Sequence, residues 1–279
     1  MHFTKMHGAG NDFIVLDTRV QALPTDNIPA LAARLCDRRR GIGADGLMVL
    51  SAPEGDADIA MRFYNSDGSL GEMCGNGARC VCRYACEHGC AGDTIRVETT
   101  AGLVTGRRTG QTEFCIRLNA PSVLETEKRL EVDGAVYRCG YVVLGDPGIP
   151  HLTVETPGLS HCDLDALRVL GRRLRFHPAL PKGANVNFYE ITGKDQVLER
   201  TYERGVEDFT LACGTGTGAV AAVLTQEGRV SGRDVQLTMD GGVLRMDVAM
   251  RDGRAFDLYL TGPTCIVCTG EVGPALLEF

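Results

Sequence analysis

The feature that most constrains the fold of this chain is an internal repeat built around two Cys-Gly-x-Gly elements. The first copy begins at Asp67 (DGSLGEMCGNGARCVCRYACEHG) and the second at Arg204 (RGVEDFTLACGTGTGAVAAVLTQEG). Each reads as a polar turn, the Cys-Gly-x-Gly element, a helical run of small and apolar residues, and a closing Gly. Cys74 and Cys213 are 139 positions apart (213 minus 74) in a chain of 279 residues. This spacing predicts two copies of one supersecondary unit.

A second landmark repeats in step with the first. An amphipathic helix is predicted after Asn27 (NIPALAARLCDRR) and another after Asp163 (DLDALRVLGRRL), each with a polar N-cap residue. The caps precede the two cysteines by 47 and 50 positions (74 minus 27 and 213 minus 163). The agreement favours duplication over coincidence.

Short alternating runs punctuated by Gly, Asp and Asn predict antiparallel strands and hairpins: FIVLD, DIAMRFY, TIRVET, FCIRL, YVVLG, VNFYEI, VQLTM and FDLYL. The run after Cys213 is apolar on nearly every side, which indicates a buried helix. We therefore expect an α+β fold of two pseudo-symmetric halves, each a curled antiparallel sheet around a central helix, with the active site in the cleft between them. The expected halves are residues 1–120 plus 264–279, with Cys74, and residues 121–263, with Cys213.

Composition narrows the class of partner. Hydrophobic residues make up 44% and charged residues 23% of the chain, as in ordinary globular proteins. The formal charge is -7 without a run of like charge, so we expect neither nucleic acid nor a membrane as partner. The start of the sequence has no export signal. We therefore expect a cytoplasmic protein whose twelve cysteines stay reduced.

The Cys-Gly-x-Gly elements indicate a specific chemistry. A Gly-rich turn that opens a helix leaves backbone N–H groups unpaired and directs the positive end of the helix dipole toward an anion. A thiol at that position is expected to have a pKa lowered toward neutrality. Two such thiols, one as thiolate and one as thiol, can invert the α-carbon of an amino acid from opposite faces, with Cys74 and Cys213 exchanging roles. That chemistry requires no cofactor, neither metal nor pyridoxal phosphate.

Other interpretations of the cysteines and glycines are weaker. Cys36, Cys115, Cys139 and Cys162 are interpreted as inert packing residues. Four thiols at Cys80, Cys82, Cys86 and Cys90 are numerous enough for a zinc or iron-sulfur site, but they fall in a helical pattern, whereas metal ligands usually come from turns or separate elements. Gly214 to Ala219 also passes for a dinucleotide fingerprint, but only 60 residues follow Ala219.

Taken together, the motifs resemble those of diaminopimelate epimerases. The resemblance covers essentially the whole chain, through FTKMHGAGNDF at 3–13, RRRGIGADGL at 38–47, FYNSDGSLGEMCGNGARC at 63–80 and YERGVEDFTLACGTGTGA at 202–219. It implies an isomerase that interconverts LL- and meso-diaminopimelate on the route to lysine and peptidoglycan precursors. It also implies a small-molecule amino-acid substrate and a homodimer.

The resemblance assigns roles to individual residues. Cys74 and Cys213 correspond to the two acid/base residues. Backbone groups at Gly75, Asn76, Gly214 and Thr215 correspond to the cradle of the reacting carboxylate. The implied ligands of the other polar substrate groups are Asn11, Asn65 and Asn185, with Arg204 on the distal carboxylate. Glu203 and His151 correspond to groups that orient the reacting amine and tune the thiols. No metal ligand is implied.

Several alternatives stay open at this level. Asn76 is compatible with a purely left-handed turn role, Glu203 and Arg204 with an exposed turn pair, and His151 with a structural histidine. The chain departs from the family pattern at Ile149, where many members have Asn, at Gly46, where some have Gln, and at Cys268, a position often aromatic near the dimer contact. A racemase of another amino acid, such as histidine or hydroxyproline, and a metal or redox thiol protein are therefore the competing functions.

Overall fold

The computed structural model describes residues 1–71 and 74–277, so the Glu72 and Met73 positions of the first Cys motif lie outside the described residues. The chain forms two compact units, Met1–Ile116 with Gly262–Phe279, and Arg117–Thr261. No helix in the described ranges is both long and apolar enough to cross a membrane.

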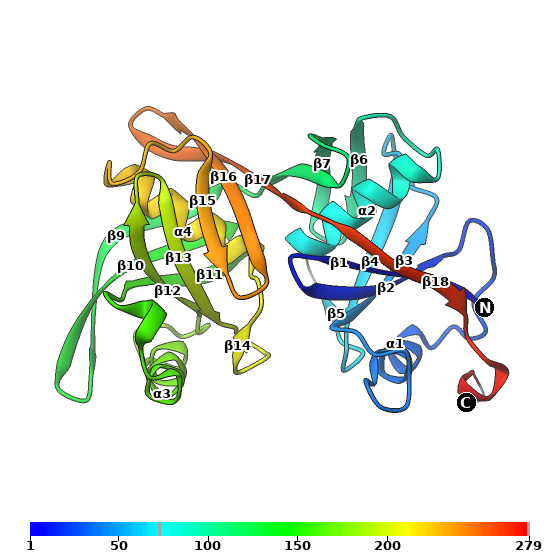
Figure 1. Cartoon of the computed structure of the whole chain (residues 1–279), viewed down its shortest axis with the longest axis horizontal. Coiled ribbons are helices and arrows are strands. Elements are labelled where there is room, and N and C mark those ends of the chain that lie inside the picture. Colours follow the sequence, from blue (N-terminus) through cyan, green and yellow to red (C-terminus); the bar gives the residue numbers. More distant parts are fainter. Residues whose placement is uncertain (72–73, 278–279) are drawn as a thin grey trace. The chain divides into compact units, whose positions relative to one another are not determined.

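The first unit combines a mixed sheet with two α-helices that lie between its strands in the sequence (Figure 1). Its elements are β1 (His2–Gly8), β2 (Asn11–Asp17), α1 (Ile28–Cys36), β3 (Gly46–Ser51), β4 (Ile59–Asn65), β5 (Leu70–Gly71), α2 (Gly75–Glu87), β6 (Thr94–Thr99), β7 (Gly102–Arg108), β8 (Glu113–Leu118), β18 (Cys265–Glu271) and η2 (Pro274–Leu276). The strands pair in the order β18-β1-β2-β3-β4-β6-β7-β8, and β5 pairs with β4. The C-terminal strand β18 thus completes the sheet beside β1.

The second unit repeats this plan. Its elements are β9 (Pro121–Val132), β10 (Ala135–Gly145), β11 (Gly148–Glu155), η1 (Leu159–His161), α3 (Leu164–Arg175), β12 (Asn185–Gly193), β13 (Gln196–Tyr202), β14 (Phe209–Thr210), α4 (Gly214–Gln226), β15 (Val235–Met239), β16 (Gly242–Arg251) and β17 (Arg254–Pro263). The strands pair in the order β9-β10-β11-β12-β13-β15-β16-β17, and β14 pairs with β13. Strand for strand, this is the order of the first unit.

The expected α+β fold of two pseudo-symmetric halves is confirmed, with one refinement of the sheets. Most neighbours are antiparallel, but β2·β3 and β4·β6 are parallel, and so are β11·β12 and β13·β15. Each parallel pair is joined by a crossover that contains a helix, as parallel strands require. The first crossover of each unit carries α1 or α3, and the second carries α2 or α4.

Both amphipathic helices begin where the sequence predicts. Asn27 caps α1 by accepting a hydrogen bond from the backbone N–H of Ala30, and Asp163 caps α3 by accepting from Asp165 and Ala166. These contacts satisfy donors that the first turn of a helix leaves unpaired. Each helix buries one side only, through Leu31 and Leu35 in α1 and Leu167 and Leu174 in α3.

The central helices α2 and α4 lie against the sheets of their own units, α2 on β1, β6 and β7 and α4 on β10, β11 and β16. Ala219 to Val223 of α4 are between 0% and 2% exposed, which confirms the prediction of a buried helix. Each buried Val or Leu side chain contributes about 1.5–3 kcal/mol through the hydrophobic effect. Packing therefore fixes the axis of each Cys-bearing helix.

Helix α2 is shorter than the helical spacing of Cys82, Cys86 and Cys90 indicates. It ends at Glu87, and the following Gly89 adopts a left-handed φ of 67°. A glycine in this conformation ends many helices because it carries no Cβ penalty. Cys90 consequently lies in the turn beyond the helix, and the expectation that all four clustered thiols are helical is wrong for this residue.

Candidate active site

Cys74 is the N-cap residue of α2. Its backbone is extended (φ -128°, ψ 111°), and its Sγ accepts a hydrogen bond from the backbone N–H of Gly77 over 3.4 Å. A Cβ at Gly77 would stand 2.9 Å from the Met48 methyl group, so glycine suits this close packing. The thiol therefore sits at the positive end of a 13-residue helix, where backbone donors favour an anion.

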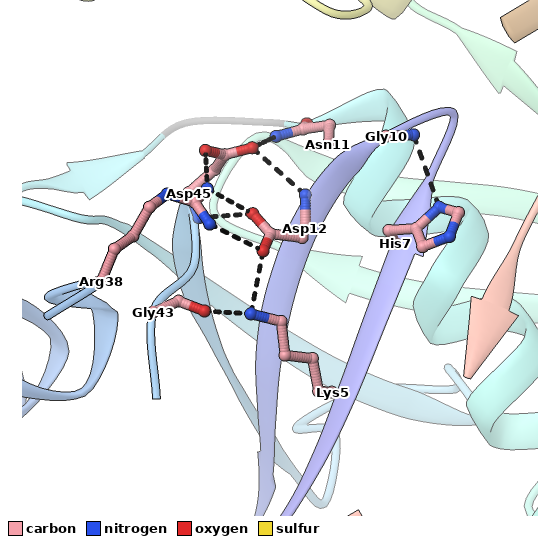
Figure 2. Close-up of polar contacts among 8 residues, drawn as sticks. All are labelled: Lys5, His7, Gly10, Asn11, Asp12, Arg38, Gly43 and Asp45. Carbon is pink, nitrogen blue, oxygen red and sulfur yellow. Dashed lines mark hydrogen bonds and ion pairs between the residues drawn. The ribbon is translucent and has the colours of Figure 1, made fainter. Parts of the chain in front are cut away.

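Asn11, at the start of β2, belongs to a network of charged residues (Figure 2). Its side chain also contacts Cys74. Its Nδ2 donates to Asp45 over 2.7 Å, and Asp45 in turn accepts from Arg38 over 2.7 Å. Because Nδ2 is committed to a carboxylate, Oδ1 must be the atom that faces Cys74, with Sγ at 3.7 Å. The network thus fixes the orientation of the Asn11 amide.

The charged network is held together by Asp12. Its carboxylate accepts from Arg38 over 2.7 Å and pairs with Lys5 over 2.9 Å (Figure 2). Burial alone would raise the pKa of Asp12, but the hydrogen bonds from Arg38 and Lys5 outweigh it and lower that pKa to about 2. Asp12 therefore stays ionised at neutral pH and anchors the loop that carries Asp45.

Asn76 lies in the first turn of α2 and is 2% exposed. Its Nδ2 donates to Asn11 Oδ1 over 3.2 Å, and its Oδ1 accepts from the guanidinium of Arg79 over 2.7 Å. Asn76 is helical and absent from the residues with positive φ among the described residues, so the interpretation as a left-handed turn residue is wrong. Its side chain serves the neighbourhood of Cys74 instead.

Asn65 ends β4 and is half-buried. Its Nδ2 donates to the hydroxyl of Ser69 over 2.9 Å, and its backbone bonds with Ser69 and Gly68 close the turn that follows. The register of β3 and β4 places Asn65 opposite Gly46. A Cβ at Gly46 would stand 2.4 Å from the Phe63 ring, so this sheet position has no room for a longer residue.

Cys213 is the N-cap residue of α4, with nearly the same backbone geometry as Cys74 (φ -121°, ψ 101°). It is only 6% exposed, and its Sγ lies 3.6 Å from the hydroxyl of Thr215. The expectation of a lowered pKa is wrong for this thiol. Burial, followed by the negative charge of Glu203, raises the pKa of Cys213 well above its usual value, which outweighs the bonds to Gly216 and Thr215.

Glu203 and Arg204 follow β13 as a half-buried pair, and their contacts are not those of a freely exposed turn. The Glu203 carboxylate accepts from the hydroxyl of Thr210 over 2.7 Å. The backbone N–H of Arg204 donates to Asn185 Oδ1 over 2.7 Å, and its guanidinium donates to the carbonyl of Lys182 over 3.3 Å. Asn185, Glu203 and Arg204 are therefore brought together in the second unit.

His151 joins this group from β11, where its Cα pairs with Asn185. It is fully buried, and burial followed by the charge of Arg204 lowers its pKa to about 3, so the ring is neutral. Its Nδ1 lies 3.4 Å from Asn187 Nδ2, an atom that can only donate. The ring proton is therefore on Nε2, which has no partner among the described residues.

Sequence reasoning missed a buried polar cluster beneath the first turn of α4. Asn187 Nδ2 donates to the carbonyl of Leu152, and its Oδ1 accepts from Thr201. Thr217 donates to Glu199 over 3.0 Å, and burial raises the pKa of Glu199 to about 8. These side chains lie at alternate positions of β12 and β13, and polar residues at i and i+2 of an otherwise apolar strand are the signal that could have revealed them.

Other thiols serve packing or local bonds. Burial raises the pKa of Cys36 and of Cys139 to about 12, which suits inert residues. In the cysteine cluster, Cys86 donates to the carbonyl of Gly92 over 3.0 Å, whereas Cys90 accepts from Arg19 over 2.9 Å. These thiols therefore have separate partners. No grouping of three His, Cys, Asp or Glu side chains suited to a metal occurs within residues 1–71 and 74–277.

A hollow of about 830 Å³ in the second unit contains none of the predicted site residues. Its charged lining is paired internally, with Arg138 on Glu127 and Arg229 on Glu155. Because these charges compensate one another, the hollow offers less to an amino acid than the two thiol sites.

Comparison with solved structures defines the class of fold. The chain resembles a probable proline racemase from Agrobacterium radiobacter K84 (TM-score 0.72, 19% identity, covering 100% of this chain and 96% of that one). It also resembles a hydroxyproline epimerase from Agrobacterium vitis (TM-score 0.70, 20% identity, covering 100% and 94%). The fold is thus one that racemases and epimerases use.

Sequence comparison identifies the family within that fold. The model of the family described as diaminopimelate epimerase matches residues 3–116 and 144–267. The diaminopimelate epimerase of Aquifex aeolicus (strain VF5) is 38% identical over 100% of both chains. The chain belongs to the diaminopimelate epimerase family.

Proposed function

We propose that this protein interconverts LL- and meso-diaminopimelate by inverting one α-carbon. The observation that carries the proposal is the equivalence of Cys74 and Cys213, which occupy the N-cap of the same helix in two duplicated units of a family member. A duplicated unit that keeps a thiol at the same helix end is what a reaction with two opposed acid/base groups requires.

The reacting carboxylate is bound by backbone donors. Helices α2 and α4 begin at Gly75 and Gly214, and the first backbone N–H groups of a helix are not used by its own hydrogen-bond ladder. We assign the carboxylate to those of Gly75 and Asn76 and of Gly214 and Thr215. Loss of the α-proton shifts negative charge onto the carboxylate oxygens. Donors aimed at those oxygens stabilise the transition state more than the ground state, which accelerates the reaction.

The two thiols exchange the proton. One Cys, as thiolate, takes the α-proton, and the other, as thiol, delivers a proton to the opposite face of the same carbon. After one turnover the protonation states are reversed, so the enzyme is ready for the other stereoisomer. Burial raises the pKa of Cys213, and the negative charge of Glu203 raises it further. Both effects favour the thiol form of Cys213, which suits a pair of one thiol and one thiolate.

The distal amino-acid end of the substrate is bound by polar side chains. Arg204 supplies a planar guanidinium for the distal carboxylate, and Asn11, Asn65 and Asn185 supply amides. The Nε2–H of His151, which has no partner among the described residues, suits an acceptor such as a carboxylate oxygen. These groups suit a substrate with an amino-acid group at each end. They therefore favour diaminopimelate over the smaller cyclic amino acids proline and hydroxyproline, which appear in the names of the structural neighbours.

We place this reaction in the cytoplasm, on the route to lysine and peptidoglycan precursors, because the mechanism needs free thiols and reducing compartments preserve them. We also propose that the protein forms a homodimer, as the resemblance to diaminopimelate epimerases implies. Measurement of its molecular mass in solution tests this oligomeric state independently.

The function is tested by incubating the purified protein with LL-diaminopimelate and resolving the stereoisomers by chiral chromatography. Parallel samples contain a metal chelator or hydroxylamine, which captures pyridoxal phosphate. We expect conversion to meso-diaminopimelate at the same rate in all samples. No conversion of diaminopimelate, together with racemisation of proline, hydroxyproline or histidine, would replace this function with that of the structural neighbours. Loss of activity with either reagent would overturn the cofactor-independent mechanism.

A further inference from the structure

The two Cys-bearing helices rest on equivalent strand residues of different character. The offset of 139 positions between the cysteines relates Gly77 of α2 to Gly216 of α4 (77 plus 139). It also relates Met48 of β3 to Asn187 of β12 (48 plus 139). The packing agrees, because a Cβ at Gly77 would stand 2.9 Å from the Met48 methyl group. A Cβ at Gly216 would stand 2.2 Å from Asn187 Oδ1. An apolar side chain thus supports one helix and an amide supports the other.

The contrast continues on the neighbouring strands. Thr201 pairs with Asn187 where Phe63 pairs with Met48. His151 pairs with the first residue of β12, and its counterpart Phe13 pairs with the first residue of β3. All six side chains are at most 9% exposed: Phe13, Met48 and Phe63 in the first unit, and His151, Asn187 and Thr201 in the second.

The fold does not require polar side chains at these places, because the first unit builds the same strand order with apolar ones. Buried polar groups cost free energy unless they are hydrogen-bonded, and the net gain from such bonds is small. The amide and the imidazole of the second unit therefore call for a function beyond the support of α4.

The amide of Asn187 has one fixed orientation. Its Nδ2 donates to the carbonyl oxygen of Leu152 over 2.8 Å, and its Oδ1 accepts from the hydroxyl of Thr201 over 2.9 Å. The reverse orientation would bring two oxygens together at Leu152. An amide nitrogen carries two N–H groups, and Nδ1 of His151 lies 3.4 Å from this one. Asn187 therefore presents a donor to the imidazole.

Glu199 on β13 leaves this orientation undisturbed. It is 0% exposed, and its carboxyl oxygens lie 3.0 Å from the hydroxyl of Thr217 and 3.4 Å from that of Thr201. Burial raises the pKa of Glu199 to about 8, so at neutral pH it is an uncharged acid. An uncharged acid is a weaker acceptor than a carboxylate, and the Thr201 hydroxyl is closer to Asn187. The Thr201 proton thus stays with the amide.

The fixed amide determines what His151 can bind. A neutral imidazole has one ring proton, and Nδ1 faces a group that can only donate, so the proton is on Nε2. This N–H is buried and has no partner within the described part of the chain. A protonated ring nitrogen has no lone pair for an ammonium group. Its partner in the complex must therefore be an acceptor.

The neighbours of His151 favour an anionic acceptor. The Cα of His151 pairs with that of Asn185, whose Oδ1 accepts from the backbone N–H of Arg204 over 2.7 Å. The charge of Arg204 acts on the imidazole and disfavours a second cation there. A carboxylate bound to Arg204 would meet both a guanidinium and an N–H donor.

We propose that Asn187 is a positioning residue that fixes His151 as the Nε2–H tautomer, and that this N–H donates to the distal carboxylate of the substrate beside Arg204. The inference rests on the proposed function and deepens it. It assigns His151 to the distal end of the substrate, whereas the resemblance to the family implies a place at the reacting amine. Asn187 acts through His151 and does not contact the substrate.

The first test is the ¹⁵N NMR spectrum of protein labelled at its six histidines. The protonated and bare ring nitrogens give separate signals, and His151→Phe identifies those of His151. In the substrate-free wild type we expect the proton on Nε2. In Asn187→Met, which introduces the residue of the first unit, Nδ1 should lose the shift caused by its hydrogen bond. A wild-type proton on Nδ1, or an Nδ1 signal unchanged in Asn187→Met, would overturn the proposal.

The second test is a double-mutant cycle in steady-state kinetics with LL-diaminopimelate. His151→Phe should raise KM roughly tenfold or more, because it removes a hydrogen bond to a charged group, with a smaller effect on kcat. Asn187→Met should raise KM roughly threefold or more. In the His151→Phe background, Asn187→Met should change KM by less than about a factor of two, because the ring through which it acts is gone.

Two kinetic outcomes would contradict the proposal. Effects that multiply in the double variant would mean that Asn187 acts independently of His151. A lower kcat with an unchanged KM in His151→Phe would place the imidazole at the reacting amine or the thiols instead. If Asn187→Met does not fold, the nearly isosteric Thr201→Val removes the donor to Asn187 Oδ1, and it should raise KM only when His151 is present.

Thr225→Val is the matched control. It removes another buried hydroxyl, in the last turn of α4, that has no partner among the described residues. It should leave both KM and the His151 signals unchanged. In the wild type, added meso-diaminopimelate should move the Nε2 signal. If that shift occurs without epimerisation, the result would count against the proposed function and still support the assignment of His151.

Discussion

The backbone N–H of Arg204 donates to Asn185 Oδ1 over 2.7 Å, so two residues proposed to bind the substrate also hold each other in place. This bond involves the main chain of Arg204 and persists whatever side chain follows. Substitution of Arg204 therefore reports on the guanidinium, without loss of the link to β12.

Arg204→Lys should weaken substrate binding. An ammonium group carries the charge but cannot form two parallel bonds with one carboxylate. We expect KM for diaminopimelate to rise by roughly tenfold or more, which corresponds to about 1.4 kcal/mol or more, with a smaller effect on kcat. Steady-state kinetics measure both. Arg168→Lys, at a surface pair with Asp165 and Asp208, is the control and should leave KM unchanged. An unchanged KM in Arg204→Lys would show that the distal carboxylate is bound elsewhere.

Cys74→Ser and Cys213→Ser should each lower the rate of epimerisation by at least ~100-fold, because a serine hydroxyl is a far weaker acid/base group than a thiol at neutral pH. Circular dichroism should show the fold intact in both. Cys268→Ser, at an exposed position of β18, should keep full activity. Retention of a tenth of the activity in either N-cap variant would argue against the assignment of that residue.

Glu199 should make the protein less stable as the pH rises. Burial raises its folded-state pKa to about 8 from a usual value of 4.5. Between these values the unfolded chain has released the proton and the folded chain retains it, so this contribution to stability is complete below pH 4.5 and is lost as the pH rises toward 8.

Glu199→Gln removes this titration and keeps a group that can bond to Thr217. At pH 8.5 we expect the variant to have a higher Tm than the wild type, with a free energy of unfolding larger by at least about 1.4 kcal/mol, the value of one unit of pKa shift. This difference in stability should shrink toward pH 5. Glu131→Gln, at an exposed position, should show no such trend. A gap that is independent of pH would mean that Glu199 is already ionised in the folded protein.

Mild oxidation should inactivate the enzyme reversibly by joining Cys74 to Cys213, and bound substrate should prevent it. Two sulfurs that each approach one carbon to ~3–3.5 Å from opposite sides are roughly 6–7 Å apart, whereas a disulfide requires ~2 Å. Peptide mapping after peroxide treatment, with and without diaminopimelate, reveals the bond. Oxidation confined to Cys86 and Cys90 in an inactive sample would show that the two N-cap thiols do not act on one substrate.

The sequence predicts the duplicated architecture because its signals are local. The Asn27 and Asp163 caps, the apolar run from Ala219 to Val223 and the repeated Cys-Gly-x-Gly turn each follow from neighbours in the chain. The parallel pairing of β2 with β3 and of β11 with β12 could not be predicted in this way, since strand direction depends on crossovers between distant segments.

The same distinction applies to the site. The N-cap placement of Cys74 and Cys213 is local, whereas the raised pKa of Cys213 comes from burial under distant strands and from Glu203. Arg79 reads as an ordinary helix residue in GNGARC, and only the approach of Gly8 on β1 shows that its charge is enclosed. Asp45 likewise gains its role from the fold, which brings it to Asn11 across 34 positions of sequence.

The central claim is that two thiols act on one carbon from opposite faces, and proton exchange in deuterium oxide tests it most directly. LL-diaminopimelate is converted in deuterium oxide, and substrate and product are separated early in the reaction and analysed by mass spectrometry. A thiol that has exchanged with solvent delivers deuterium to the new face, so the account predicts deuterium at the inverted carbon of the meso product and almost none in the remaining LL substrate. Meso product that retains the original α-proton, or deuterium that enters the LL substrate as fast as product forms, would indicate a single base and contradict the account.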